Sequence, residues 1–159
     1  MLKYRNYAIV FQEVPNEISL GINISGCQHR CPGCHSQYLW EDAGCNLLDD
    51  LDFMIERHMP YISCICFMGG DHDQTELIKA CEKVKQHGLK TCLYTGIDDV
   101  RKLDMDLCYR LDYLKLGRYD AEKGPINMPT TNQRFYSLYH TRSGIRYQDL
   151  TYKFWKEDL

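Results

Sequence analysis

The sequence predicts an α/β fold: an open, partial (β/α) barrel of about five to six mostly parallel strands, in one domain over residues 1–159. Strand-like and helix-like segments alternate, as in parallel sheets built from right-handed crossovers. The 159 residues are too few for a complete eight-fold barrel, which needs about 250. No internal repeat or obvious linker divides the chain.

The first predicted elements are two strands and a helix. Residues 7–11 form a short apolar strand, and residues 18–25, ISLGINIS, alternate apolar and polar side chains. Residues 47–58 place their apolar side chains on one stripe of a helix, which Pro60 ends.

The middle of the chain predicts a buried strand followed by a second helix. Residues 61–68, YISCICFM, are almost continuously apolar, as expected for a buried parallel strand. The next helix begins at a cap, Asp71 or Asp73, runs to about His87 and stops at Gly88.

The remaining predicted elements are short. Residues 89–94 and 111–116 are expected strands, and residues 97–103 an expected short helix. From Gly117 on, we expect irregular, aromatic-rich structure.

Composition bounds the function class and the compartment. The chain is 44% apolar and 26% charged, as expected for a soluble globular protein, and its net charge of −3 argues against a nucleic-acid partner. It has no apolar run of about 18 residues, so we expect no membrane span, and its first 20 residues lack an apolar stretch, so we expect no signal peptide there. Nine cysteines, an odd number without a secretion signal, predict a reducing cytoplasmic location.

The cysteines fall into two groups. Cys27, Cys31 and Cys34 share one stretch, GCQHRCPGCHSQYLW, with the spacing C-x3-C-x2-C. The other six are expected to be small buried hydrophobic residues: Cys45, Cys64, Cys66, Cys81, Cys92 and Cys108.

The three-cysteine stretch is compatible with more than one metal. Structural zinc prefers four ligands, so Cys27 would need His29, His35 or a distant cysteine to complete the set. A four-iron cluster is ordinarily held by four thiolates, so three leave one iron without a protein ligand. That open position could take a small molecule carrying an amine and a carboxylate.

This stretch resembles the signature of the radical S-adenosylmethionine (SAM) superfamily. The resemblance implies a [4Fe-4S] cluster on Cys27, Cys31 and Cys34, with the methionine part of SAM on the open iron. It implies reductive cleavage of SAM to a 5′-deoxyadenosyl radical, and it places Gly33, Cys34 and His35 beside the cofactor.

A second stretch, FMGGDHD, resembles the superfamily's glycine-glycine-glutamate motif. Glycines at Gly69 and Gly70 let the backbone approach a ligand closely, and its carbonyls can accept hydrogen bonds from the cofactor's ammonium. Asp71 stands where glutamate is usual. The next predicted strand ends in LYTG, which could bring Tyr94 or Thr95 near the ribose.

CPGCHSQYLW resembles the glycyl-radical-activating enzymes, and TTNQRFY at residues 130–136 is similar to their members that activate anaerobic ribonucleoside-triphosphate reductases. The resemblance implies a large glycyl-radical reductase as partner and a flavodoxin- or ferredoxin-like electron donor. The chain departs from that group at residues 112–119, which lack its usual Asp-Gly pair, and the sequence assigns no role to Lys115.

Other functions stay open from the sequence. One is activation of another glycyl-radical enzyme, such as the pyruvate formate-lyase type, or radical chemistry on a free metabolite. A non-catalytic zinc, iron–sulfur or electron-carrier module is another. Five histidines are expected to be ordinary surface or loop residues: His29, His58, His72, His87 and His140.

Overall fold

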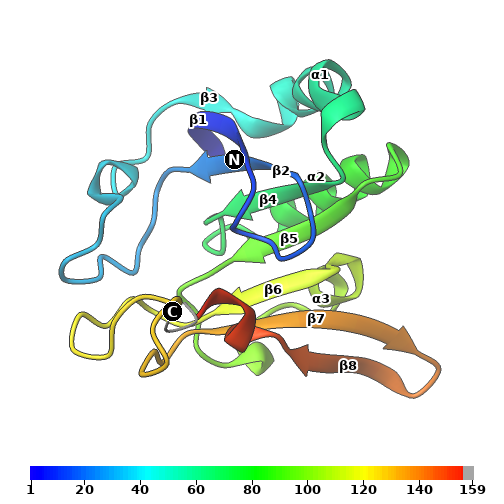
Figure 1. Ribbon diagram of the computed structural model, residues 1–159. Coiled ribbons are helices and arrows are strands. Elements are labelled where there is room, and N and C mark those ends of the chain that lie inside the picture. The colour runs from blue at the N-terminus through cyan, green and yellow to red at the C-terminus, as the bar shows by residue number, and fades with distance from the viewer. Residues whose placement is uncertain (156–159) are drawn as a thin grey trace.

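The computed structural model describes residues 1–155, and its centre is a single sheet of eight strands (Figure 1). The strands are β1 (Lys3–Val10), β2 (Ser19–Ile24), β3 (Cys45–Asn46), β4 (Cys64–Met68), β5 (Lys90–Tyr94), β6 (Tyr113–Leu116), β7 (Arg134–Thr141) and β8 (Gly144–Asp149). The α-helices are α1 (Leu47–His58), α2 (Gln74–Gln86) and α3 (Met105–Arg110). Short 3₁₀ helices lie at Gln37–Leu39, Met59–Tyr61, Val100–Lys102 and Thr151–Phe154.

The prediction of an open, mostly parallel (β/α) barrel is wrong. The strand order is β3-β1-β2-β4-β5-β6-β7-β8, and four of the seven pairings within residues 1–155 are antiparallel. Only β2, β4, β5 and β6 pair in parallel. The short links from β1 to β2 and from β7 to β8 favour antiparallel neighbours, because a parallel pair needs a long crossover connection.

The two long helices follow from their sequences. The predicted helix over residues 47–58 is confirmed as α1. At the start of α2, the carboxylate of Asp73 accepts a hydrogen bond from the backbone N–H of Glu76 at 3.1 Å, so Asp73 is the cap. Gly88 follows α2 with a left-handed φ of 75°, which favours glycine at a helix end.

The sheet separates two hydrophobic cores because side chains alternate between its faces. The larger core includes buried side chains of α1, α2 and α3, packed with strand residues such as Ile65, Phe67 and Leu93. The smaller core contains Val14, Cys64, Cys66, Cys92, Phe135 and Leu150. The cysteine-rich face of β4 and β5 is therefore covered by loops and the C-terminal segment rather than by helices.

The expectation of irregular structure after Gly117 holds for residues 117–133 but is wrong for β7 and β8, which form a hairpin at one edge of the sheet (Figure 1). Gly144 begins β8 with a φ of 127°, and its carbonyl accepts a hydrogen bond from the Thr141 hydroxyl at 2.8 Å. Within residues 1–155, no helix combines the length and apolar character needed to cross a membrane.

Candidate metal centre and cofactor cavity

The three-cysteine loop follows β2 and is anchored to the 3₁₀ helix at Gln37–Leu39. The backbone N–H groups of Gly26 and Cys27 both donate to the Leu39 carbonyl, at 2.8 and 3.0 Å. Within the loop, the N–H of Cys34 donates to the carbonyl of Cys31 at 3.1 Å. These bonds fold the loop into a compact turn with Cys27, Cys31 and Cys34 half-buried and free of disulfides.

The loop and the strand ends enclose one cavity of about 240 Å³. Its wall includes all three loop cysteines together with Gly69, Gly70, Asp71 and Thr95. Sequence segments far apart therefore meet here because β2, β4 and β5 are parallel and end at the same edge of the sheet.

Two of the predicted site residues lie outside this cavity wall. Gly33 is exposed and has a φ of 76°, a conformation in which it forms the turn between Cys31 and Cys34. His35 is exposed as well, and its ring lies 5.8 Å from that of Tyr119.

The turn at Gly69 and Gly70 packs tightly against neighbouring residues, Ile24 among them. Gly69 and Gly70 have φ values of 104° and 100°, which favour glycine. A Cβ on Gly70 would lie 3.1 Å from Leu77 and 3.2 Å from Ile24. Both glycines therefore let the chain turn closely around the end of β2, and their backbone borders the cavity.

Asp71 is held by two partners from different segments. Its Oδ2 atom lies 2.6 Å from His29 Nε2, and it also accepts a hydrogen bond from the Thr95 hydroxyl. The side chains of His29 and Asp71 are only 17% and 7% exposed. His29 lies in a loop, as expected, but it is a half-buried link in the site rather than an ordinary loop residue. The sequence offers no local sign of its partner 42 residues away.

Lys115 is the second residue that the sequence did not assign. It lies on β6 and lines the same cavity as the three loop cysteines. Its Nζ atom lies 5.3 Å from the centre of the Tyr94 ring and 3.4 Å from the carbonyl oxygen of Gly117. Burial lowers the pKa of Lys115 to about 8, while nearby thiols, Cys31 among them, act in the opposite direction.

Five of the remaining six cysteines behave as expected, because Cys64, Cys66, Cys81, Cys92 and Cys108 are buried. Burial raises the pKa of Cys64 and Cys92, which keeps these thiols protonated. Cys45 is exposed on the edge strand β3, so the expectation of burial is wrong there.

The chemistry of the donors fits an iron–sulfur cluster. Cysteine thiolate is the ordinary protein ligand of these clusters, and three free cysteines border one cavity. Among residues 1–155, no three His, Cys, Asp or Glu side chains already converge as a metal-binding group. Cluster binding therefore requires the Cys27–Cys34 loop to draw its thiols together.

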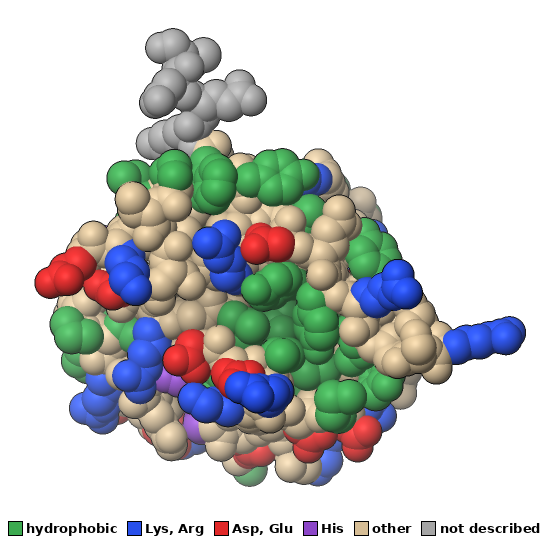
Figure 2. Space-filling view, turned by 90° about the horizontal axis from the view of Figure 1, so that it is seen from below, with side chains coloured by type: hydrophobic (Ala, Val, Ile, Leu, Met, Phe, Trp, Pro, Cys, Tyr) green, Lys and Arg blue, Asp and Glu red, His purple; other side chains and the backbone are tan. Residues whose placement is uncertain are grey.

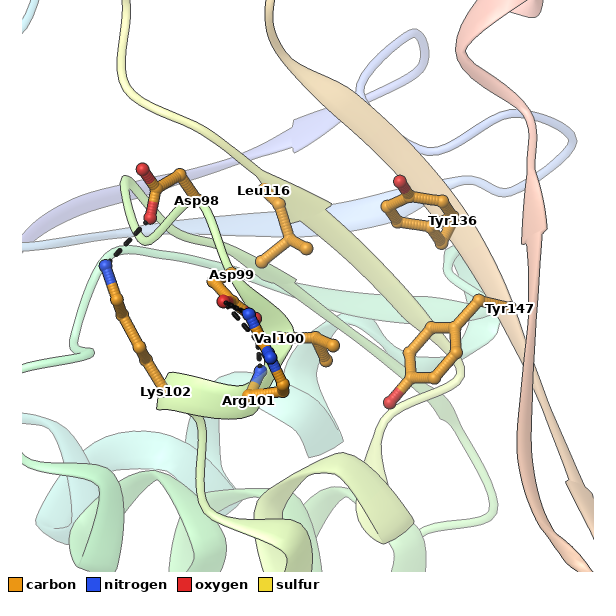
Figure 3. A pocket seen from close by; sticks show the side chains of 8 residues that line it. All are labelled: Asp98, Asp99, Val100, Arg101, Lys102, Leu116, Tyr136 and Tyr147. Carbon is orange, nitrogen blue, oxygen red and sulfur yellow. Dashed lines mark hydrogen bonds and ion pairs between the residues drawn. The ribbon is translucent and has the colours of Figure 1, made fainter.

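A second hollow lies away from the cysteines, and Figure 3 shows it between the 3₁₀ helix at Val100–Lys102 and the side chains of Tyr136 and Tyr147. Its charged groups pair with one another: Asp99 binds Arg101 at 2.7 Å, and Asp98 binds Lys102 at 3.1 Å. The space-filling view from below (Figure 2) shows hydrophobic side chains at the centre of that face, with acidic and basic side chains around them. None of the described residues that line the Figure 3 hollow is a cysteine or histidine, so we assign the metal centre to the cysteine cavity.

Comparison with known proteins supports an iron–sulfur assignment. A family model described as a 4Fe-4S single cluster domain matches residues 18–136, about three quarters of the chain, and this range includes all three loop cysteines. No curated protein matches the chain. No solved structure matches it either. The chain belongs to the family of 4Fe-4S single cluster domains.

Proposed function

We propose that the protein is a radical SAM activating enzyme that generates a glycyl radical on a partner anaerobic ribonucleoside-triphosphate reductase. Membership of the 4Fe-4S single cluster family supports the metal part of this proposal. The sequence resemblances in the cysteine loop, the Gly-Gly-Asp turn and residues 130–136 support the enzyme class.

One observation carries the proposal: among residues 1–155, the cavity wall contains three cysteines and no fourth. Cys27, Cys31 and Cys34 would hold three irons of a four-iron cluster, which leaves one coordination position for a small molecule. The same wall contains the backbone of Gly69 and Gly70, where a ligand can approach closely. A pure electron carrier would use a fourth protein ligand instead.

The chain's own groups would bind and orient SAM. The carbonyls at the Gly69-Gly70 turn would accept hydrogen bonds from its ammonium, and Thr95 lies at the next strand end for the ribose. Asp71 is already paired with His29 and Thr95, so its role would be to hold the turn. With a cluster and SAM bound, the site would supply reductive cleavage: one electron from a flavodoxin- or ferredoxin-like donor would pass through the cluster to SAM, giving methionine and, once a hydrogen atom is taken from a partner glycine, 5′-deoxyadenosine.

Anaerobic reconstitution with iron and sulfide tests the cluster and the cleavage together. We expect about four irons per chain, and 5′-deoxyadenosine after reduction in the presence of SAM. Changing Cys27, Cys31 or Cys34 to Ala should abolish cluster assembly and cleavage, whereas Cys45→Ala, an exposed cysteine outside the cavity, should leave both intact. A fully loaded, reducible cluster that never cleaves SAM would rule out this function and favour an electron-carrier role.

The partner is tested separately. Incubation of the loaded protein with SAM, a reductant and an anaerobic ribonucleotide reductase should produce a glycyl radical visible by electron paramagnetic resonance (EPR). The control is pyruvate formate-lyase under the same conditions. A radical on pyruvate formate-lyase alone would reassign the partner, and cleavage of SAM without a radical on either protein would favour a free metabolite as substrate.

A further inference from the structure

We propose that Lys115 places a positive charge beside the iron–sulfur site and raises the reduction potential of the cluster. This inference rests on the location of the cluster in the proposed function, at Cys27, Cys31 and Cys34. It does not depend on SAM cleavage or on the identity of the partner.

The position of Lys115 follows from the register of the central strands. It pairs with Tyr94 on β5 and with Phe135 on β7. Its neighbours in β6, Leu114 and Leu116, belong to the helix-side core, so the alternation of side chains directs Lys115 to the opposite face. That face carries the smaller core and leads to the cysteine cavity.

Lys115 has no acidic partner among the ion pairs of residues 1–155. Among residues 1–155, Asp71 is the one carboxylate in the cavity wall, and it is bonded to His29 and Thr95. The contacts of Lys115 are the long hydrogen bond to Gly117 and the face of the Tyr94 ring. An amine in such surroundings lacks a counter-charge, and burying a charge without one is costly.

A cluster held by the loop would supply that counter-charge. Three thiolates already make such a site anionic, and reduction adds one more negative charge. Lys115 lines the same cavity as all three cysteines, so its amine would face a cluster held there. Its charge therefore stabilises the reduced state more than the oxidised state, which raises the reduction potential.

The other charged groups of the cavity do not replace Lys115. Arg118 also lines the wall, but it is exposed, so water weakens its field at the cluster. His29 is engaged with Asp71. Within the described part of the chain, Lys115 is thus the cationic group of this cavity that is both partly buried and without an acidic partner.

The experiment is a potentiometric titration of the reconstituted cluster, followed by EPR and without SAM. Lys115→Met should keep the parent's iron content but lower the midpoint potential. At a fixed potential, the ratio of reduced to oxidised cluster should fall at least tenfold, about 59 mV for a one-electron couple. Lys115→Arg, which keeps the positive charge, should have a midpoint potential close to that of the parent protein. The matched control is Lys79→Met, which removes a charge from the exposed surface of α2.

A fully loaded Lys115→Met cluster with an unchanged potential would overturn the proposal. The proposal would also fail if Lys115→Met bound SAM more weakly while its midpoint potential stayed the same. That result would indicate that Lys115 pairs with the carboxylate of SAM. If Lys115→Met binds little iron, Lys115→Gln also removes the charge but keeps a polar side chain, and its midpoint potential then tests the proposal. Failure of the parent to bind iron would count against the metal site itself, and a shifted potential without SAM cleavage would count only against the activating function.

Discussion

His29 Nε2 lies 2.6 Å from Asp71 Oδ2, and this contact ties the three-cysteine loop to the Gly-Gly turn. Thr95 donates to the same carboxylate oxygen from the end of β5. The N–H of Ile97 in turn donates to the Thr95 hydroxyl at 3.0 Å. One carboxylate therefore joins three separate segments of the cavity wall: the cysteine loop, the Gly-Gly turn and the end of β5.

Removing this link should loosen the hold of the loop on its cluster. We expect His29→Ala to release iron to a chelator about 10-fold faster than the parent, since groups that orient metal ligands change affinity by roughly that amount. Iron release is followed by the absorbance of the chelate. His140→Ala, in the β7–β8 hairpin, is the control. Equal release rates for the two variants would show that the His29–Asp71 contact does not support the site.

The same contact makes Gly96 sensitive to substitution. A Cβ on Gly96 would lie 2.7 Å from the His29 ring, so Gly96→Ala must displace this histidine. We expect the free energy of unfolding to fall by about 1–3 kcal/mol. In the double variant with His29→Ala the ring is gone, and the two losses should be less than additive, by about 1 kcal/mol. Chemical denaturation of the four proteins measures this coupling, and strict additivity would contradict the steric explanation.

Local sequence patterns predict the two long helices and the shared edge, but not the short helix α3 or the direction of the outer strands. Residues 47–58 carry a helical stripe, and α1 has those bounds. The β7 strand was missed because its alternation is hidden: Phe135 is buried in the smaller core, while Leu138 is buried in the other. Both faces of β7 thus carry apolar or aromatic residues, which removes the usual strand signal.

In the candidate site too, the sequence predicts the residues that share a local motif but not those brought in by contacts between distant segments. Spacing within one loop singled out Cys27, Cys31 and Cys34, and the structure places them in one cavity with Gly69 and Gly70. The roles of His29 and Lys115 depend on contacts between segments far apart in the chain, so no local pattern could indicate them. Strand register brings Lys115 beside Tyr94, and register is set by tertiary packing.

Phe135 belongs to the smaller core and packs against Tyr94, which lines the cysteine cavity. It is fully buried, and its ring centre lies 5.1 Å from that of Phe154 and 6.4 Å from that of Tyr94. We expect Phe135→Ala to lower the free energy of unfolding by about 3–5 kcal/mol, because a large cavity is left behind. Phe53 is 62% exposed on α1, so Phe53→Ala should change stability by no more than about 0.5 kcal/mol. Comparable losses in urea denaturation would argue against this packing role.

Glu17 should make stability depend on pH. Its carboxylate accepts hydrogen bonds from Lys90 at 2.9 Å, from Tyr113 at 2.8 Å and from the Ser63 hydroxyl. Burial alone would raise the pKa of Glu17, but these three donors outweigh it and hold the pKa below its ordinary value of 4.5.

The folded protein therefore binds this proton less readily than the unfolded chain does. The stabilisation by Glu17 is complete above about pH 4.5 and is lost as the pH falls through the lowered value. Glu17→Gln should cost about 1–3 kcal/mol at neutral pH, since it removes a buried, charge-assisted acceptor. The difference between parent and variant should shrink as denaturation is repeated at successively lower pH down to about 3. A difference that stays constant over this range would show that the Glu17 carboxylate does not contribute through its charge.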